Sequence, residues 1–187
     1  MIQIYTGDGK GKTTAAFGLA MRAAGQGLKV RVIQFMKGNT FSGELSSAER
    51  LGIEVFQFGR TCPHAAVIKG GFMECLDCGQ CLIRAREMDE LDRKKAALAW
   101  QLARDSICSK ACDLLILDEI MAALKHGLVS LKELIIWLQD LPSSVEVVLT
   151  GRNAPPELIQ IADLVSEVKE IKHPYKQKKQ GRRGFEY

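Results

Sequence analysis

Residues 2–25 of the chain, IQIYTGDGKGKTTAAFGLAMRAAG, contain the pattern that decides the fold. A short run of β-forming residues, Ile2 to Tyr5, precedes a glycine-rich segment. An Ala-, Leu- and Met-rich segment follows and predicts a helix that ends near Gly25 or Gly27. The order strand, loop, helix is the setting in which glycine-rich loops bind phosphate.

The loop between that strand and helix is GDGKGKTT, residues 7–14. Its glycines allow consecutive backbone N–H groups to point at phosphate oxygens, and the helix amino terminus adds a positive field. The general motif G-x-x-x-x-G-K-[ST] has glycine where this chain has Thr6, and Gly7 comes one place later. A tight turn that merely contains Gly and Lys is the alternative, but the flanking elements favour phosphate binding.

The loop supplies the candidate nucleotide ligands. Lys12 is expected to contact phosphate oxygens, and Thr13 is expected to offer its hydroxyl to Mg²⁺. The full set of nucleotide-binding candidates in the loop is Gly7, Asp8, Gly9, Lys10, Gly11, Lys12, Thr13 and Thr14.

Two acidic residues, Asp118 and Glu119, end the apolar run LLILDE. A nucleotide-binding sheet presents a carboxylate to Mg²⁺ at such a strand end, so both are candidate magnesium ligands. Glu119 joins Lys12 and Thr13 as a candidate catalytic residue, because it would orient water if ATP is hydrolysed and would hold the metal otherwise. A solvated strand end is the alternative. No guanine-reading N-K-x-D follows, so we expect ATP with Mg²⁺.

The rest of the chain alternates apolar strand patterns with helical patterns. We expect strands at 29–36, 53–58, 113–118, 145–150 and 164–171, and helices at 43–51, 82–107, 131–138 and 154–162. The apolar stripe of the longest helix is expected to contain Met88, Leu91, Leu98 and Leu102. This alternation predicts an α/β fold with a doubly wound, mostly parallel sheet of the RecA-like P-loop type, which binds ligands at the carboxyl ends of its strands.

Composition bounds the class of protein. The 187 residues are 47% hydrophobic and 26% charged, which excludes disorder and fits one nucleotide-binding domain over residues 1–171. No apolar run approaches the ~20 residues that span a bilayer, and the amino terminus lacks the order of an export signal, so we expect a cytoplasmic protein with no membrane partner.

Positive charge is concentrated in the basic tail, residues 172–187. The chain has a net charge of +4, but the tail holds six Lys/Arg against one Glu, which leaves −1 for the other residues. Tracking of nucleic-acid phosphates needs basic groups spread over a folded face. We therefore expect no nucleic-acid partner.

Cysteines cluster in an irregular segment, residues 59–81. Cys75, Cys78 and Cys81 follow one another with two residues between consecutive cysteines, and Cys62 or His64 would complete four ligands. Without an export signal, disulfides are not expected, and the spacing predicts a metal site. Zinc and a [4Fe-4S] cluster both fit such thiols, and free cysteines are the alternative.

Five strings carry a family resemblance: TGDGKGKTTAAFGLAMRAAGQG, VIQFMKG, LLILDEI, LTGR and the ending HPYKQKKQGRRGFEY. In this order and at these separations the chain resembles the bacterial P-loop ATP:corrinoid adenosyltransferases, which act on cob(I)alamin or cob(I)yrinic acid a,c-diamide. The resemblance covers nearly the whole chain. The loop of that family also lacks the first glycine of the general motif.

The resemblance implies transfer of the 5′-deoxyadenosyl group of ATP to the Co(I) centre of a corrinoid, with release of triphosphate, in adenosylcobalamin biosynthesis or salvage. It also implies that Arg22 contacts the nucleotide and that Phe72, within GFME, packs against the corrin. Phe72 as ordinary core is the alternative, and Glu74 stands where a second aromatic residue is expected.

The resemblance further implies a homodimer, a reductase for Co(II) and a carboxyl-terminal tail near the active site. The amino-terminal helix of the family has no counterpart before Ile2, so another segment is expected to cover the nucleotide. At the cysteines, zinc would order the corrinoid loop, an iron–sulfur cluster would deliver an electron to Co(II), and a thiol would otherwise contact cobalt directly.

Two other functions fit a phosphate loop: an ATP-hydrolysing switch or RecA-like nucleic-acid module, and an accessory protein for a metal centre. Neither needs the QFMKG string or the particular ending of the chain. These two features favour the adenosyltransferase.

Overall fold

The central element of the fold is a parallel sheet. The computed structural model describes residues 1–38, 41–76, 78–81, 83, 88–172 and 182–185. Within these ranges six strands pair in the order β3-β2-β4-β5-β1-β6, and every pairing is parallel. The strands are β1 (Ile2–Thr6), β2 (Val30–Phe35), β3 (Glu54–Phe58), β4 (Leu114–Asp118), β5 (Glu146–Thr150) and β6 (Leu164–Glu167). The predicted α/β class with a doubly wound parallel sheet is confirmed.

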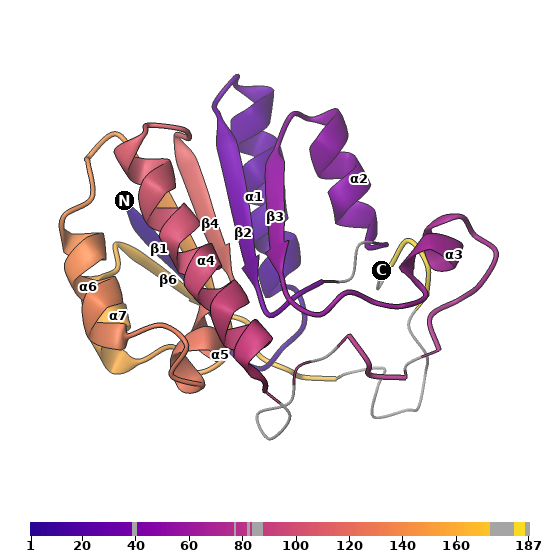
Figure 1. Cartoon of the computed structure of the whole chain (residues 1–187). Coiled ribbons are helices and arrows are strands. Elements are labelled where there is room, and N and C mark those ends of the chain that lie inside the picture. Colours follow the sequence, from indigo (N-terminus) through magenta and orange to yellow (C-terminus); the bar gives the residue numbers. More distant parts are fainter. Residues whose placement is uncertain (39–40, 77, 82, 84–87, 173–181, 186–187) are drawn as a thin grey trace.

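Helices cover both faces of this sheet (Figure 1). One face packs against α1 (Lys12–Gly25) and α2 (Gly43–Arg50). The other packs against α4 (Glu90–Cys108), α5 (Ile120–Lys125), α6 (Leu131–Gln139) and α7 (Pro156–Ile161). The short helix α3 (Ala65–Lys69) lies beyond the edge strand β3 (Figure 1).

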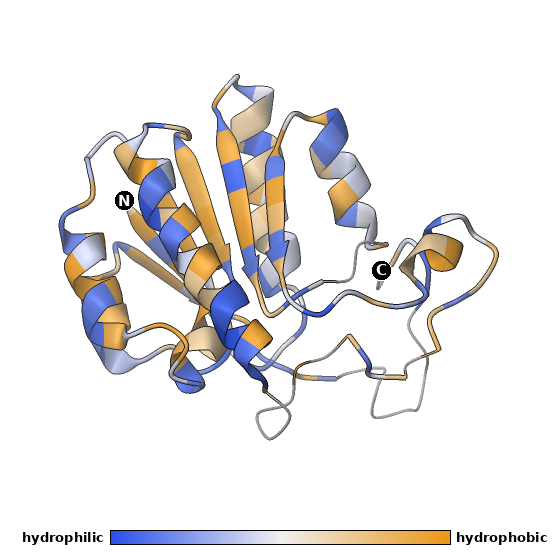
Figure 2. Cartoon of the chain, in the orientation of Figure 1, coloured by the Kyte–Doolittle hydropathy of each residue, from blue (hydrophilic) through white to orange (hydrophobic). Residues whose placement is uncertain are grey.

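Coverage on both faces explains the composition of the strands. Every residue of β4 is buried, and Figure 2 shows a largely apolar β4 covered by helices in which hydrophobic and hydrophilic residues are mixed. Across the described ranges, every helix is too short or too polar to traverse a bilayer.

Helix α4 starts later than the sequence predicts. The expected helix covered residues 82–107, but α4 begins at Glu90. A capping box fixes this start. The Asp89 carboxylate accepts a hydrogen bond from the Asp92 N–H at 2.8 Å, and the Asp92 carboxylate accepts one from the Asp89 N–H at 3.2 Å. Residues 82 and 84–87 of the expected helix lie outside the described residues.

The expected apolar stripe of this helix is wrong at two of its positions, although Leu102 does pack against the core. Leu91 and Leu98 are 59% and 55% exposed. Small residues occupy most of the buried face instead, which allows the helix to lie close to the sheet. The buried apolar residues of α4 are Ala96, Ala99, Trp100, Ala103 and Ile107. Trp100 meets Trp137 edge-to-face, with ring centroids 5.2 Å apart.

The sequence analysis did not predict two short helices, and it placed the end of one strand too late. Helices α3 and α5 have five and six residues, too few for a periodic pattern to show. Strand β6 ends at Glu167 rather than at residue 171, because the backbone after it turns to meet the phosphate loop: the Gly9 N–H donates to the Val168 carbonyl at 2.8 Å.

Replacing Asp92 with alanine should destabilise the fold. Its carboxylate is buried, caps α4 and pairs with the Arg60 guanidinium at 2.6 Å. We expect a loss of about 2–3 kcal/mol in the free energy of unfolding at pH 7, measured with urea. The exposed Glu90, which pairs with Lys94, offers a control: Glu90→Gln should cost less than about 0.5 kcal/mol.

The same carboxylate predicts a pH dependence. Burial on its own raises the pKa of Asp92, but hydrogen bonds from Arg60 and the Asp89 backbone hold it below its ordinary value. Its contribution is therefore complete above the ordinary carboxyl pKa of about 4 and is lost as the pH falls through the lower, folded-state value. The stability difference between wild type and Asp92→Ala should shrink at acidic pH, and a difference that grows there contradicts the assignment.

Candidate active site

A pocket of about 750 Å³ lies at the carboxyl ends of the central strands. Its volume falls within the ~300–1,000 Å³ usual for small-molecule sites. The lining has four cationic and two acidic side chains and includes two aromatic rings. The lining residues are Gly9, Lys10, Gly11, Lys12, Thr13, Thr14, Phe17, Lys37, Ser42, Gly43, Glu44, Ser47, Glu119, Arg152, Gly184 and Phe185.

The glycines of the loop allow close packing against the segment after β6. A Cβ on Gly7 would lie 2.4 Å from the Val168 carbonyl oxygen, and Gly7 has a φ of 99°. A Cβ on Gly9 would lie 2.8 Å from the Lys169 backbone. Gly11, with a φ of 122°, turns the chain into α1. Gly7 and Gly9 have no space for a Cβ, and Gly7 and Gly11 adopt a backbone conformation that favours glycine.

Thr6, which stands in place of the first glycine of the motif, has a structural role. It is buried, and its Oγ1 accepts a hydrogen bond from the Ala154 N–H at 3.1 Å. The hydroxyl thus joins the end of β1 to the loop after β5. Gly7 supplies the left-handed backbone one position later.

Lys12 is 7% exposed and faces the pocket from the first turn of α1. Its Nζ donates to the Gly9 carbonyl oxygen at 2.7 Å. Burial lowers the pKa of Lys12, and the nearby Glu119 carboxylate opposes that shift. An ammonium so poorly hydrated gains strongly from a phosphate ligand.

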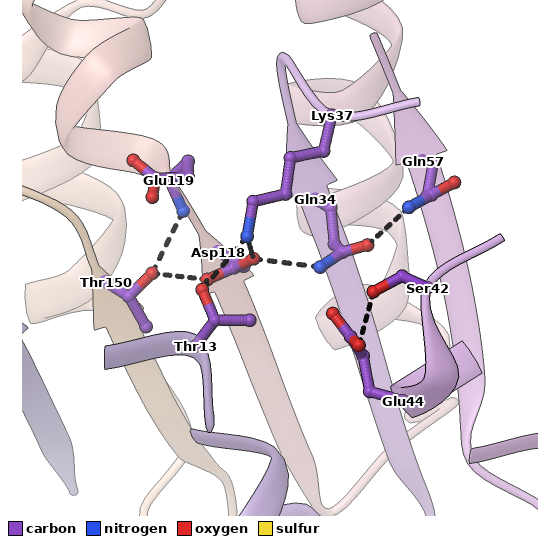
Figure 3. A network of polar contacts seen from close by, with 9 residues as sticks. All are labelled: Thr13, Gln34, Lys37, Ser42, Glu44, Gln57, Asp118, Glu119 and Thr150. Atoms are coloured by element: carbon purple, nitrogen blue, oxygen red, sulfur yellow. Dashed lines mark hydrogen bonds and ion pairs between the residues drawn. The ribbon is translucent and has the colours of Figure 1, made fainter. Parts of the chain in front are cut away.

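The buried carboxylate of Asp118 is the centre of a polar network (Figure 3). Its Oδ1 accepts from Thr13 Oγ1 at 2.9 Å and from Thr150 Oγ1 at 2.6 Å. Its Oδ2 accepts from Gln34 Nε2 at 2.9 Å and from Lys37 Nζ at 2.8 Å. Burial on its own raises the pKa of Asp118, but the Lys37 ammonium and these hydrogen bonds hold it below its ordinary value. Asp118 is therefore ionised.

Glu119 is the N-cap residue just before α5 and has a left-handed backbone, φ 60° and ψ 25°. Its N–H donates to Thr150 Oγ1 at 3.0 Å, so one threonine holds both acidic residues. Burial, followed by repulsion from Asp118, raises the pKa of Glu119. A non-glycine residue in this conformation is costly and is typical of functional sites.

Sequence reasoning missed two members of the network, Gln34 and Thr150. Gln34 is a single polar residue in the buried strand β2, and a polar group in such a strand needs a partner. Thr150 ends β5 as Asp118 ends the adjacent β4, and parallel strand ends share one edge. Both signals were present in the sequence. Gln57 extends the hydrogen-bond network, because its Nε2 donates to Gln34 Oε1 at 2.8 Å.

Most of the predicted nucleotide ligands gather at this pocket. Residues 9–14 and Glu119 line it, and Asp118 lies beneath Thr13. Gly7 and Asp8 do not contribute to the lining. Arg22 is exposed in the last turn of α1, about 15 Å along the helix from Lys12. Its contact with the nucleotide stays a prediction.

Phe72, the predicted corrin contact, is 88% exposed. It is therefore not the ordinary core residue of the alternative interpretation. It lies outside the pocket lining, but its neighbour Gly71 packs closely against Arg183, whose Nη2 donates to the Lys69 carbonyl at 3.2 Å. Gly184 and Phe185, next in the chain, line the pocket. Residues 173–181 and 186–187 of the predicted basic tail lie outside the described residues.

The cysteines of the predicted metal site gather in one region. Cys62 is buried in a small apolar cluster, and Cys75 and Cys81 pack against it, while Cys78 is exposed. Burial, followed by the neighbouring cysteines, raises the pKa of Cys81. In the described part of the chain, no group of three or more His, Cys, Asp or Glu residues is arranged to hold a metal ion.

Comparison with known proteins agrees with this geometry. A family model described as ATP:corrinoid adenosyltransferase BtuR/CobO/CobP matches residues 1–187. A corrinoid adenosyltransferase of Sinorhizobium sp. is 34% identical over 188 residues, covering 100% of this chain and 80% of the relative. The corrinoid adenosyltransferase of Pseudomonas aeruginosa is 34% identical over 187 residues, covering 100% and 83%. That of Escherichia coli is 33% identical over 187 residues, covering 100% and 85%.

Replacing Thr150 with valine should weaken the site at nearly constant volume. The substitution removes one of the two hydrogen bonds to Asp118 Oδ1, which keeps the one from Thr13, and it removes the threonine acceptor of the Glu119 N–H. We expect the free energy of unfolding to fall by about 1–3 kcal/mol in chemical denaturation. Thr150→Ser keeps the hydroxyl and should recover most of it. A valine variant as stable as wild type would show that the hydroxyl is dispensable.

Proposed function

The chain belongs to the ATP:corrinoid adenosyltransferase family, and from that premise we propose how its pocket serves the reaction. The protein transfers the 5′-deoxyadenosyl group of ATP to a corrinoid in adenosylcobalamin biosynthesis. The observation that carries the proposal is the junction of phosphate loop and strand end: buried Lys12 faces the pocket, and Thr13 is hydrogen-bonded to Asp118. We infer that the triphosphate of ATP lies along residues 9–14.

The chemistry makes specific demands on such a pocket. The electron pair of Co(I) attacks the ribose C5′, a cobalt–carbon bond forms, and the C5′–O bond breaks. Triphosphate leaves with the electron pair of that bond, so negative charge grows on the leaving group. No proton needs to move at the reacting carbon. Alignment and electrostatic stabilisation therefore carry the catalysis, and alignment alone contributes up to ~7–11 kcal/mol in favourable cases.

The cations of the lining meet the demand for charge stabilisation. Lys10, Lys12 and Arg152 face the pocket together with the amino end of α1. We assign Lys12 to the leaving triphosphate, because its ammonium is nearly excluded from water and faces the loop. Backbone N–H groups of the loop would add directional hydrogen bonds to the same oxygens.

The oxygens around Asp118 fit a magnesium ion. Thr13 Oγ1 and Asp118 Oδ2 already accept hydrogen bonds from one positive group, the Lys37 ammonium. Hydroxyl and carboxylate oxygens are the ligands that Mg²⁺ prefers in nucleotide sites. We assign the ion to Thr13 and Asp118, with Glu119 as the further carboxylate at the same strand end. When bound, Mg²⁺ neutralises charge on the triphosphate.

For the corrinoid we propose contact with Phe72. Its ring is exposed rather than packed in the core, and the adjacent Gly71 touches Arg183, close in the chain to pocket residues Gly184 and Phe185. A large exposed aromatic ring beside a ligand pocket is suited to a flat macrocycle. Contact of Arg22 with the nucleotide is proposed on the family resemblance alone.

We also propose that the four clustered thiols bind metal, as zinc or as an iron–sulfur cluster. The gathering of Cys62, Cys75 and Cys81 supports it, with Cys78 close enough to influence the pKa of Cys81. Four thiolates suit either metal centre. Free thiols are the alternative outcome.

The family resemblance also supports a homodimer, a cytoplasmic location and a reductase for Co(II). These remain proposals, and light scattering during size-exclusion chromatography measures the first of them.

The transfer reaction predicts its phosphate product. Incubated with Mg-ATP and a chemically reduced corrinoid without oxygen, the protein should release one intact triphosphate for each cobalt–carbon product. Lys12→Ala should lower the rate by about 100-fold or more, because a major cation for the leaving group is removed. The control Lys29→Ala changes an exposed residue just before β2, at the opposite end of the sheet, and should react like wild type.

Phosphate analysis by chromatography and the absorption spectrum of the corrinoid give the two readouts. Orthophosphate and ADP formed without corrinoid would instead indicate an ATP-hydrolysing switch.

The cysteine proposal predicts bound metal after anaerobic purification. We expect about one zinc ion per chain, or iron with a brown visible absorption band, measured by elemental analysis and spectroscopy. A Cys75→Ser, Cys81→Ser double variant should lose the metal, whereas Cys108→Ser, an exposed cysteine outside the cluster, should retain it. If the wild-type protein stays metal-free after both metals are supplied, the metal proposal is wrong and the cysteines are free thiols.

A further inference from the structure

Lys37 occupies a position that the roles assigned so far do not use. Its Nζ donates to Thr13 Oγ1 at 2.9 Å and to Asp118 Oδ2 at 2.8 Å (Figure 3). These are the two groups assigned above to Mg²⁺. One ammonium thus bridges the phosphate loop and the end of β4, and its side chain also lines the pocket.

The backbone around Lys37 is built to hold it there. Met36, the residue before it, has a left-handed φ of 57°. A Cβ on Gly38 would lie 2.3 Å from the Arg60 carbonyl oxygen, and a Cβ on Gly59 would lie 2.5 Å from the Lys37 backbone. The chain after β2 and the chain after β3 therefore touch backbone to backbone. Lys37 starts from a fixed Cα, and only its flexible four-carbon stem is free to turn.

Asp118 requires a cation in this position. Its side chain is 0% exposed, and an ionised carboxylate without a positive partner is very costly in such surroundings. Gln34 and Thr150 supply neutral hydrogen bonds. Within the described part of the chain, the ion pair of Asp118 is made by Lys37.

A metal ion on Thr13 and Asp118 cannot share these oxygens with the ammonium. Two positive charges a few ångströms apart repel strongly inside a protein, where water screens them poorly, and the metal ion is divalent. The Lys37 side chain is 28% exposed on the side of the pocket, so it has room to leave. The pocket it would enter is the one proposed for the triphosphate.

We propose that Lys37 is a displaceable resident cation. In the nucleotide-free protein its ammonium neutralises Asp118 and blocks the magnesium position; when Mg-ATP binds, the ammonium moves off Thr13 and Asp118 and onto the triphosphate. This rests on the magnesium assignment made under the proposed function. Its consequence is that the free protein binds divalent ions poorly and the metal enters with the nucleotide.

The test measures Mn²⁺ binding without nucleotide, by electron paramagnetic resonance, in wild type and Lys37→Met. The variant uncovers an unneutralised carboxylate and hydroxyl, so we expect it to bind Mn²⁺ at least about tenfold more tightly than wild type. Its melting temperature should be lower than that of wild type without metal and should rise on addition of Mn²⁺, while that of wild type should not change. Equal Mn²⁺ affinity in the two proteins overturns the proposal.

Arg152→Gln is the matched control, because it removes another cation from the same pocket and no hydrogen bond joins Arg152 to Asp118 within the described contacts. If it gains Mn²⁺ affinity as Lys37→Met does, the effect is general electrostatics and the specific role of Lys37 is refuted. Lys37→Gln, which keeps a hydrogen-bond donor without the charge, replaces Lys37→Met if the latter does not fold. It should show the same gain.

A second measurement examines where the ammonium goes. With saturating Mg²⁺, Lys37→Met should bind inorganic triphosphate about tenfold more weakly than wild type in calorimetry, since the displaced ammonium is missing. Undiminished affinity refutes the second half of the proposal. None of these measurements uses corrinoid or follows turnover, so a failure of the transfer reaction would be seen separately. ATP-dependent Mn²⁺ binding by wild type tests the magnesium assignment on its own.

Discussion

One buried negative charge organises the site. Asp118 ends a strand that is covered on both faces, and its carboxylate is removed from water. Such a group is tolerated only with several hydrogen bonds and a cation. The structure meets this requirement with groups from β2, the chain after β2, α1 and β5, so the same contacts that satisfy the charge also bring the phosphate loop to the strand end.

A second constraint is steric and acts on the phosphate loop. The loop lies so close to the backbone after β6 that side chains at Gly7 and Gly9 would collide with it. The conformation of the loop therefore depends on contact with the backbone after β6 as well as on its own sequence. This support leaves its upper side free to face the pocket, where Lys12 and Thr13 begin α1.

The sequence was sufficient for the strands, because buried parallel strands are short apolar runs between turn signals, as in β4 and β5. It was also sufficient to place the glycine-rich loop and Asp118 at the same edge of the sheet. It was insufficient for the face of α4, because Asp92 is buried by its pairing with Arg60, a partner distant in the chain, while Leu91 remains exposed. Gln34 and Thr150 were not recognised as partners of Asp118, because the strand order decides which strands lie on either side of β4.

The strand order has a consequence for protein synthesis. The first strand, β1, lies between β5 and β6, which are contributed by residues 146–150 and 164–167. A nascent polypeptide emerging from the ribosome thus presents its phosphate loop long before the strands and the Val168 carbonyl that support it exist. The phosphate loop is translated before five of the six described strands, and the nucleotide site is complete only after β6 has been made.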